Sequence, residues 1–254
     1  MTTLIDAHVH LSDEAFAYLL QPTVNTLRYL KIKAVSVSLG IFTAMKNMSL
    51  ASSYGDVVIP FVGIHPSSAN ENIEEFTDFV MKNEDKIAGI GEIGLDRRYV
   101  SDEDAYARQK NLFEHMLLLA ERLGKPTSIH SRGSVDDVLD ILQSYKLKGN
   151  QLHWFAGSKK QLRRATDMGC YLSYGPVLVY SEDKRSSLRK TPKDLVLVET
   201  DGPVKYSRCF EDNAALPSVL PSVAFVLAKT LGIDYDDACN ILKQNSQQYL
   251  KRAL

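Results

Sequence analysis

Two histidines stand two residues apart near the start of the chain, in the run Asp6-Ala-His8-Val-His10. Residues two apart on a β-strand point to the same face, so these two imidazoles face one point. Two imidazoles at one point need a proton or a cation between them, and neutral imidazole is the side chain that most often binds metal. A lone histidine at a strand end is more often a packed, hydrogen-bonded residue, so the pair needs partners to define a metal site.

Partners of the right chemistry follow other apolar segments of the chain. The sequence has six histidines, and five of them lie in or directly after short apolar runs. His115, the sixth, lies in a long amphipathic stretch and is interpreted as structural. Six side chains could converge as metal ligands: His8, His10, Glu92, His130, His153 and Asp201. Because six such ligands suffice for two divalent ions that share a carboxylate, we predict two ions, Mg²⁺, Mn²⁺ or Zn²⁺.

The elements that must position these residues alternate between two textures. Short, mostly continuous apolar runs are typical of parallel strands buried on both faces. Amphipathic stretches lie between them, and the clearest, Asp104–Leu123, is followed by Gly124 and Pro126, a helix-stop signal. The expected strands are Leu4–Leu11, Ala34–Gly40, Val57–His65, Ile87–Leu95, Pro126–Ser131, Gln151–Phe155, Cys170–Tyr174 and Leu195–Thr200.

This rhythm over 254 residues predicts an α/β fold, a (β/α)8 TIM barrel, as a single domain spanning residues 1–254. An open doubly wound sheet is the alternative, but its glycine-rich phosphate fingerprint is missing after the first strand. Three segments read less clearly. Ile41–Tyr54 offers little more than a short helix, Pro217 and Pro221 bracket an irregular stretch, and Asp234–Ala253 reads as one or two helices that close the barrel.

Active sites of TIM barrels lie at the carboxyl ends of the strands, where the candidate ligands stand. Three further residues there could contact substrate: His65, Arg132 and Lys205. Arginine suits bidentate contact with phosphate, although exposed basic residues usually form a solvated rim. Trp154 and Phe155 could stack on a nucleobase or pack in the core.

Composition limits the function classes. The formal net charge of −1 gives no overall electrostatic attraction for nucleic acid, so an anionic substrate must be held by local charge. Three widely spaced cysteines indicate no disulfide framework and favour a reducing, cytoplasmic location. No signal peptide and no apolar run of membrane-spanning length stands out, and no feature indicates a protein partner.

Six motifs occur in order along the chain. They are Asp6-Ala-His8-Val-His10, Gly63-Ile-His65-Pro66, Gly91-Glu92-Ile-Gly94-Leu-Asp96, Ile129-His130-Ser-Arg132, His153-Trp-Phe155-Ala-Gly157-Ser158 and Glu199-Thr-Asp201-Gly-Pro203. Together they resemble the TatD-type metal-dependent hydrolases, the TatD deoxyribonuclease family of the amidohydrolase-like barrels. The resemblance implies that His8, His10 and Asp201 bind one ion, that His130 and His153 bind a second, and that Glu92 bridges them. It also implies that His65 contacts substrate or supports the ligands.

The resemblance implies hydrolysis of nucleic-acid phosphodiesters, with DNA as the expected substrate and Glu92 and Asp201 as catalytic residues. Asp201 is placed to take a proton from the attacking water. Two other functions stay open: an amido- or esterhydrolase for a small metabolite, and a metal-binding scaffold without turnover. The chain departs from the family pattern at Ser67-Ser68 and over Lys205–Pro217, two loops expected to meet the substrate.

Overall fold

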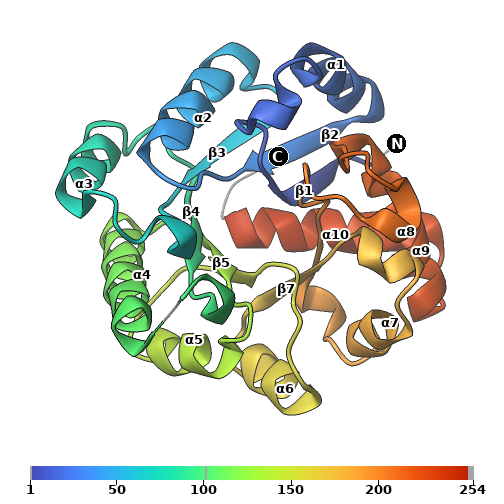
Figure 1. Cartoon of the computed structure of the whole chain (residues 1–254). Coiled ribbons are helices and arrows are strands. Elements are labelled where there is room, and N and C mark those ends of the chain that lie inside the picture. Colours follow the sequence, from blue (N-terminus) through green and yellow to red (C-terminus); the bar gives the residue numbers. More distant parts are fainter. Residues whose placement is uncertain (1, 101, 251–254) are drawn as a thin grey trace.

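A computed structural model describes residues 2–100 and 102–250 of the chain. Eight parallel strands follow one another in sequence order around a barrel, and the helices form an outer ring (Figure 1). The strands are β1 (Leu4–Val9), β2 (Ile32–Ser36), β3 (Val58–Val62), β4 (Gly89–Gly94), β5 (Thr127–His130), β6 (Asn150–Leu152), β7 (Tyr171–Tyr174) and β8 (Val196–Val198). Each lies within or overlaps a predicted run, so the (β/α)8 barrel is confirmed.

The α-helices connect and cover the strands. They are α1 (Leu20–Leu30), α2 (Ile41–Tyr54), α3 (Ile73–Lys82), α4 (Glu103–Leu123), α5 (Val135–Leu142), α6 (Lys159–Asp167), α7 (Glu182–Leu188), α8 (Ser207–Phe210), α9 (Leu220–Leu231) and α10 (Tyr235–Leu250). In α4, His115 hydrogen bonds to Thr77 of α3 at 2.9 Å between Nε2 and Oγ1. This contact fits the structural role predicted for His115.

The last strand meets the first through polar groups as well as backbone. The backbone N–H of Asp201, just after β8, donates to the carbonyl of His8 at 2.9 Å. The buried carboxyl group of Asp6 accepts the backbone N–H of Thr200 at 3.0 Å and its hydroxyl at 2.5 Å. These contacts join β1 to the segment after β8 at the carboxyl end of the barrel.

The end of the last helix packs into the amino-terminal end of the barrel. Tyr249 and Leu250, at the end of α10, pack in one buried cluster with residues of β1, β2, β3, β7 and β8. The hydroxyl of Tyr249 donates to the carbonyl of Thr127, the first residue of β5, at 3.0 Å. The Asp234–Ala253 segment is therefore one helix over its described part, and it covers the amino-terminal end of the barrel.

The stretch between Pro217 and Pro221 was expected to be irregular and is helical, whereas the helix expected within Ile41–Tyr54 is confirmed and fills that range. Pro217 opens a short 3₁₀ helix, and Pro221 stands in the first turn of α9, where proline's missing N–H costs nothing. The α2 segment forms 14 residues of regular helix. Its apolar periodicity is weak because a polar residue, Asn47, anchors it: the Asn47 amide accepts from Ser36 Oγ at 2.7 Å and donates to the carbonyls of Ser36 and Phe61 at 3.0 and 3.1 Å.

Across residues 2–100 and 102–250, no single helix is long and apolar enough to cross a membrane; one bent pair, Pro217–Leu231 with Tyr235–Leu250, passes by length and composition only.

Replacing Asn47 by alanine should lower the free energy of unfolding by about 3 kcal/mol, because it leaves buried carbonyls and a hydroxyl without partners. Urea unfolding followed by circular dichroism measures the change. Ser49→Ala, on the exposed side of the same helix, is the matched control and should change stability little. Equal stability of the two variants would contradict the anchoring role of Asn47.

Candidate metal centre

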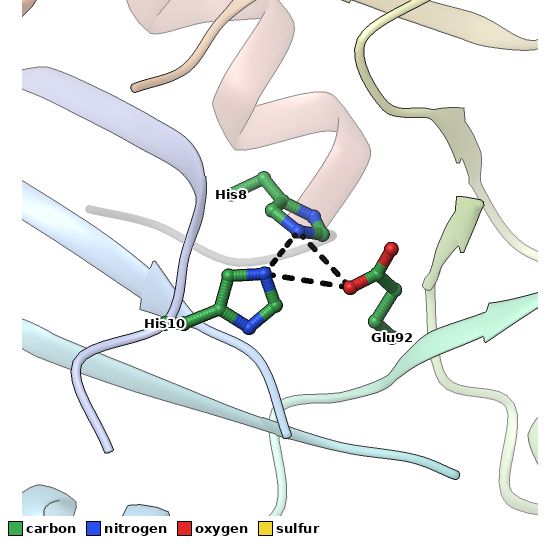
Figure 2. Close-up of side chains that lie close together, drawn as sticks. All are labelled: His8, His10 and Glu92. Atoms are coloured by element: carbon green, nitrogen blue, oxygen red, sulfur yellow. Dashed lines mark hydrogen bonds and ion pairs between the residues drawn. The ribbon is translucent and has the colours of Figure 1, made fainter. Parts of the chain in front are cut away.

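Four donor atoms form a cluster at the end of β1, where His8 lies in the strand and His10 directly follows it. The Nε2 atoms of His8 and His10 lie 3.3 Å apart, and both face Glu92 Oε2, at 3.5 and 3.4 Å (Figure 2). Asp201 Oδ1 lies 3.6 and 3.4 Å from the same two nitrogens. Bonds of about 2.1 Å to a tetrahedral ion place its ligand atoms about 3.4 Å apart. The spacing of this cluster therefore fits one divalent ion.

The other oxygen of Glu92 faces a second group of imidazoles. Glu92 Oε1 lies 2.7 Å from His153 Nε2 and 2.8 Å from His130 Nδ1, and those two nitrogens are 3.2 Å apart. His65 Nε2 approaches the same oxygen at 3.6 Å. The six predicted ligands are thus brought together, with one carboxylate between two groups of nitrogens.

The ionisation of this cluster is set by burial and by the charges of its neighbours. Burial, together with the charge of His153, lowers the pKa of His8 to about 4, so its ring is neutral at pH 7. Burial opposes the charge of Glu92, but the neighbouring histidines, with His153 foremost, hold its pKa well below the ordinary value. Burial opposes a charge on His153, but the neighbouring Glu92 carboxylate raises its pKa to about 9, so this ring must release a proton to bind an ion. His8 Nδ1 hydrogen bonds to Ser128 Oγ at 2.8 Å, which leaves Nε2 for the centre.

A bulge in β1 aims the histidine pair. Asp6 pairs with Ala34 of β2 and Val9 pairs with Ser36, so β1 advances three residues while β2 advances two. Bulges re-aim side chains and are common beside active sites. The two-residue spacing predicted that His8 and His10 share one face of the strand. The bulge lies at this pair and turns that face toward the other candidate ligands inside the barrel.

Glycines allow the neighbouring strands to approach the centre. A Cβ atom on Gly63, just after β3, would lie 2.7 Å from the carbonyl oxygen of Glu92. At Gly94 the backbone has φ of +137°, and a Cβ there would lie 2.1 Å from the carbonyl oxygen of His130. Only glycine fits both positions, because a side chain would push β4 away from the strands that carry its partner ligands.

Asp96 is a functional residue to which sequence reasoning assigned no role. Its buried Oδ2 accepts from His130 Nε2 at 2.7 Å and from Arg132 Nε at 2.8 Å, and its Oδ1 accepts the N–H of Arg98 at 2.7 Å. A carboxylate on the outer nitrogen of a metal-binding histidine sets the tautomer and ring orientation. Asp96 therefore leaves His130 Nδ1 for the centre. Its place directly after β4 was the available signal.

Glu199 is a second residue of this kind. It is buried after β8, and its carboxylate accepts from Trp154 N at 2.7 Å, Ser173 Oγ at 2.5 Å and Gln151 Nε2 at 3.3 Å. Burial raises its pKa to about 7. These bonds tie the loop after β6, which carries His153 and Trp154, to β7 and β8.

A cavity of about 490 Å³ opens above the centre. Its lining residues are His10, Asp13, Leu39, His65, Ser67, Glu92, Tyr99, His130, Ser131, Arg132, His153, Trp154, Ala156, Asp201, Pro203 and Val204. Two of the three residues predicted to contact substrate, His65 and Arg132, are therefore in place at the cavity. Lys205 is exposed and is not among the described lining residues, so its contact with substrate stays a prediction.

The positions of His65, Trp154 and Phe155 refine the sequence interpretation. His65 stands beside Glu92 as well as in the cavity wall, and its Nδ1 accepts the N–H of Ser67 at 3.1 Å, which directs Nε2 toward the centre. Phe155 is 1% exposed and belongs to the core. Trp154 is half-buried and lines the cavity. Core packing is therefore shown for Phe155, whereas stacking of Trp154 on a nucleobase stays a prediction.

A parallel barrel with imidazole and carboxylate donors at the carboxyl ends of its strands defines a metal-dependent hydrolase. Residues 5–251 match the family model described as TatD related DNase. YabD of Bacillus subtilis, an uncharacterized metal-dependent hydrolase, is 27% identical, over 98% of this chain and 99% of the relative. An uncharacterized metal-dependent hydrolase of Haemophilus influenzae is 30% identical, over 78% and 80%.

A solved structure agrees with these sequence matches. The crystal structure of YJJV, a TatD homologue from Escherichia coli, superposes with a TM-score of 0.90 at 23% identity and covers 98% of both chains. The chain belongs to the TatD family of metal-dependent hydrolases.

Asp96→Asn should weaken divalent-metal binding by about 10- to 100-fold, because His130 loses the carboxylate that orients it. Competition with a fluorescent chelator measures the affinity for Zn²⁺ and Mn²⁺. Asp104→Asn, at the exposed start of α4, should bind metal like the unmodified chain. Unchanged affinity in Asp96→Asn would show that packing alone holds His130.

Proposed function

We propose that this protein is a deoxyribonuclease that hydrolyses phosphodiester bonds with two divalent ions at the centre described above. The observation that carries the proposal is the split of Glu92: one oxygen faces His8 and His10, and the other faces His130 and His153. A shared carboxylate between two ligand groups is the arrangement used by two-metal phosphodiesterases. The family description, TatD related DNase, supports the same substrate class.

The reaction needs a group that accepts a proton from the attacking water, and Asp201 is placed to do so. Bound divalent ions would polarise the phosphate oxygens and lower the pKa of a water molecule toward neutrality. Asp201 lies in the cavity wall. Burial opposes its charge, but the hydrogen bond with His10 and the charge of His153 lower its pKa, so its carboxylate is ionised at pH 7. An ionised carboxylate beside the centre can accept the proton of the attacking water.

Local positive charge for an anionic substrate is present at Arg132. Its Nε donates to Asp96, its guanidinium lies 5.1 Å from the centre of the Tyr99 ring, and 46% of its side chain is exposed. This anchoring leaves the terminal nitrogens for a phosphate, the anion whose geometry suits guanidinium. The net charge of −1 gives no overall attraction for an anion. A contact with Arg132 would hold the anion locally instead.

The alternative of an amido- or esterhydrolase uses the same centre on a different electrophile. Dihydroorotase from Campylobacter jejuni has the same barrel at a TM-score of 0.68 and 13% identity, a likeness that concerns the fold alone. A panel of small amides and esters, run beside DNA, separates the two functions.

The cytoplasmic location and the lack of a protein partner stay predictions.

Asp201→Asn and Glu92→Gln should each reduce nucleotide release from labelled single-stranded DNA by about 10³-fold, because the first loses the proton acceptor and the second the shared ligand. A chelator should abolish the activity, and Mg²⁺, Mn²⁺ or Zn²⁺ should restore it. Asp85→Asn, an exposed control in the connection before β4, should keep it. Activity that survives both the chelator and Glu92→Gln would refute the proposed function.

Arg132→Ala should lower kcat/KM on DNA by about 30-fold, since one charge-assisted contact with phosphate is worth about 2 kcal/mol. Lys205→Ala provides the comparison, because Lys205 is exposed outside the cavity lining. Steady-state kinetics at fixed ionic strength measures both. A loss in Lys205→Ala as large as that in Arg132→Ala would place the anion at the loop after β8 instead.

A further inference from the structure

One wall of the cavity is formed by an aromatic residue that the metal chemistry does not use. Trp154 directly follows the candidate ligand His153, is half-buried and lines the cavity. The residues Ala156, Pro203 and Val204 line the same cavity, so apolar surface accompanies the indole beside the charged centre. A flat apolar surface next to a site for anions suits a ligand that has both a ring and a phosphate.

Trp154 is held in one position from two directions. Its backbone has φ of +40°, a left-handed conformation that non-glycine residues rarely adopt, and its N–H donates to buried Glu199 at 2.7 Å. Its ring stacks on Tyr206, with ring centres 5.1 Å apart and planes at 28°. Backbone strain of this kind persists where surrounding contacts enforce it, and it concentrates at functional sites.

Tyr206 comes from the loop in which the sequence departs from the family pattern. It is 2% exposed, and its hydroxyl donates to the carbonyl of Thr200 at 3.1 Å. Its ring also meets Phe210 edge-on at 6.2 Å. Tyr206 is not among the described residues that line the cavity, so it supports Trp154 from behind. The divergent loop thus has a structural role: it supplies the residue that supports the indole.

We propose that Trp154, supported by Tyr206, is a stacking platform for the nucleobase next to the scissile phosphate. The choice of ligand rests on the proposed function, and the platform selects substrates that carry a flat ring over small aliphatic amides and esters. Stacking does not depend on base identity, because every base has a π-face, so purine and pyrimidine nucleotides should both bind. In this arrangement Tyr206 is a positioning residue that acts through Trp154.

The chain contains one tryptophan, so fluorescence excited selectively at tryptophan, and not at tyrosine, reports on Trp154 alone. Titration of the metal-loaded protein with dAMP and with dTMP should quench the emission saturably, whereas 2-deoxyribose 5-phosphate, which has no base, should not. Tyr206→Leu should weaken the nucleotide affinity seen by this signal, and Tyr206→Phe, which keeps the ring, should preserve it. Equal responses to nucleotide and to the base-free phosphate would overturn the platform.

A second measurement uses turnover. On an oligonucleotide whose terminal residue lacks a base, kcat/KM of the unmodified protein should fall about tenfold, the lower range of one stacking contact. On the normal oligonucleotide, kcat/KM of Trp154→Leu should be about tenfold below that of the unmodified protein. On the abasic oligonucleotide, kcat/KM of Trp154→Leu should equal that of the unmodified protein. Trp154→Phe should show a smaller decrease on the normal oligonucleotide. A loss in Trp154→Leu that is equal on both substrates would refute the platform.

The two proposals fail in different ways. Base-dependent quenching without any hydrolysis of DNA would keep the platform and refute the deoxyribonuclease. Hydrolysis of both oligonucleotides at the same rate, without base-dependent quenching, would keep the deoxyribonuclease and refute the platform.

Discussion

The arrangement of the site depends on one carboxylate placed between two groups of imidazoles. Glu92 is buried in β4, and its oxygens face histidines in and after β1 on one side and histidines at the ends of β5 and β6 on the other. An unpaired carboxylate in such a position would be costly, and the surrounding nitrogens offset that cost. A carboxylate held ionised there is also what a pair of divalent ions requires, so the same contact serves stability and chemistry.

A layer of buried carboxyl groups supports this centre from outside. Asp6 joins β1 to the segment after β8, Asp96 orients His130, and Glu199 holds the loop that carries His153 and Trp154. Each ties a ligand-bearing strand to another part of the barrel rim, so the distances between ligands depend on hydrogen bonds in addition to packing. The cavity walls are attached to the same layer, through Arg132 on Asp96 and through Trp154 on Glu199.

Local sequence carried enough information for the barrel and for the residues that come together as candidate ligands. Continuous apolar runs marked all eight strands because strands buried on both faces carry no polar alternation. Polar residues at the ends of such runs marked the candidate ligands, since those ends meet at one face of a barrel. The same patterns failed where a polar group does the anchoring, as at Asn47 of α2, and where proline begins a helix, as at Pro221 of α9.

The sequence by itself determined which residues could bind metal, because histidine and carboxylate chemistry and strand position are both local properties. Only the tertiary structure decided which of those residues contact one another. The division of Glu92 between two clusters, the support of His130 by Asp96 and the exclusion of Lys205 from the described cavity lining all depend on distances between strands and loops far apart in the chain. Such distances arise from a bulge, from glycine contacts and from buried hydrogen bonds across the barrel, and no local pattern in the sequence encodes them.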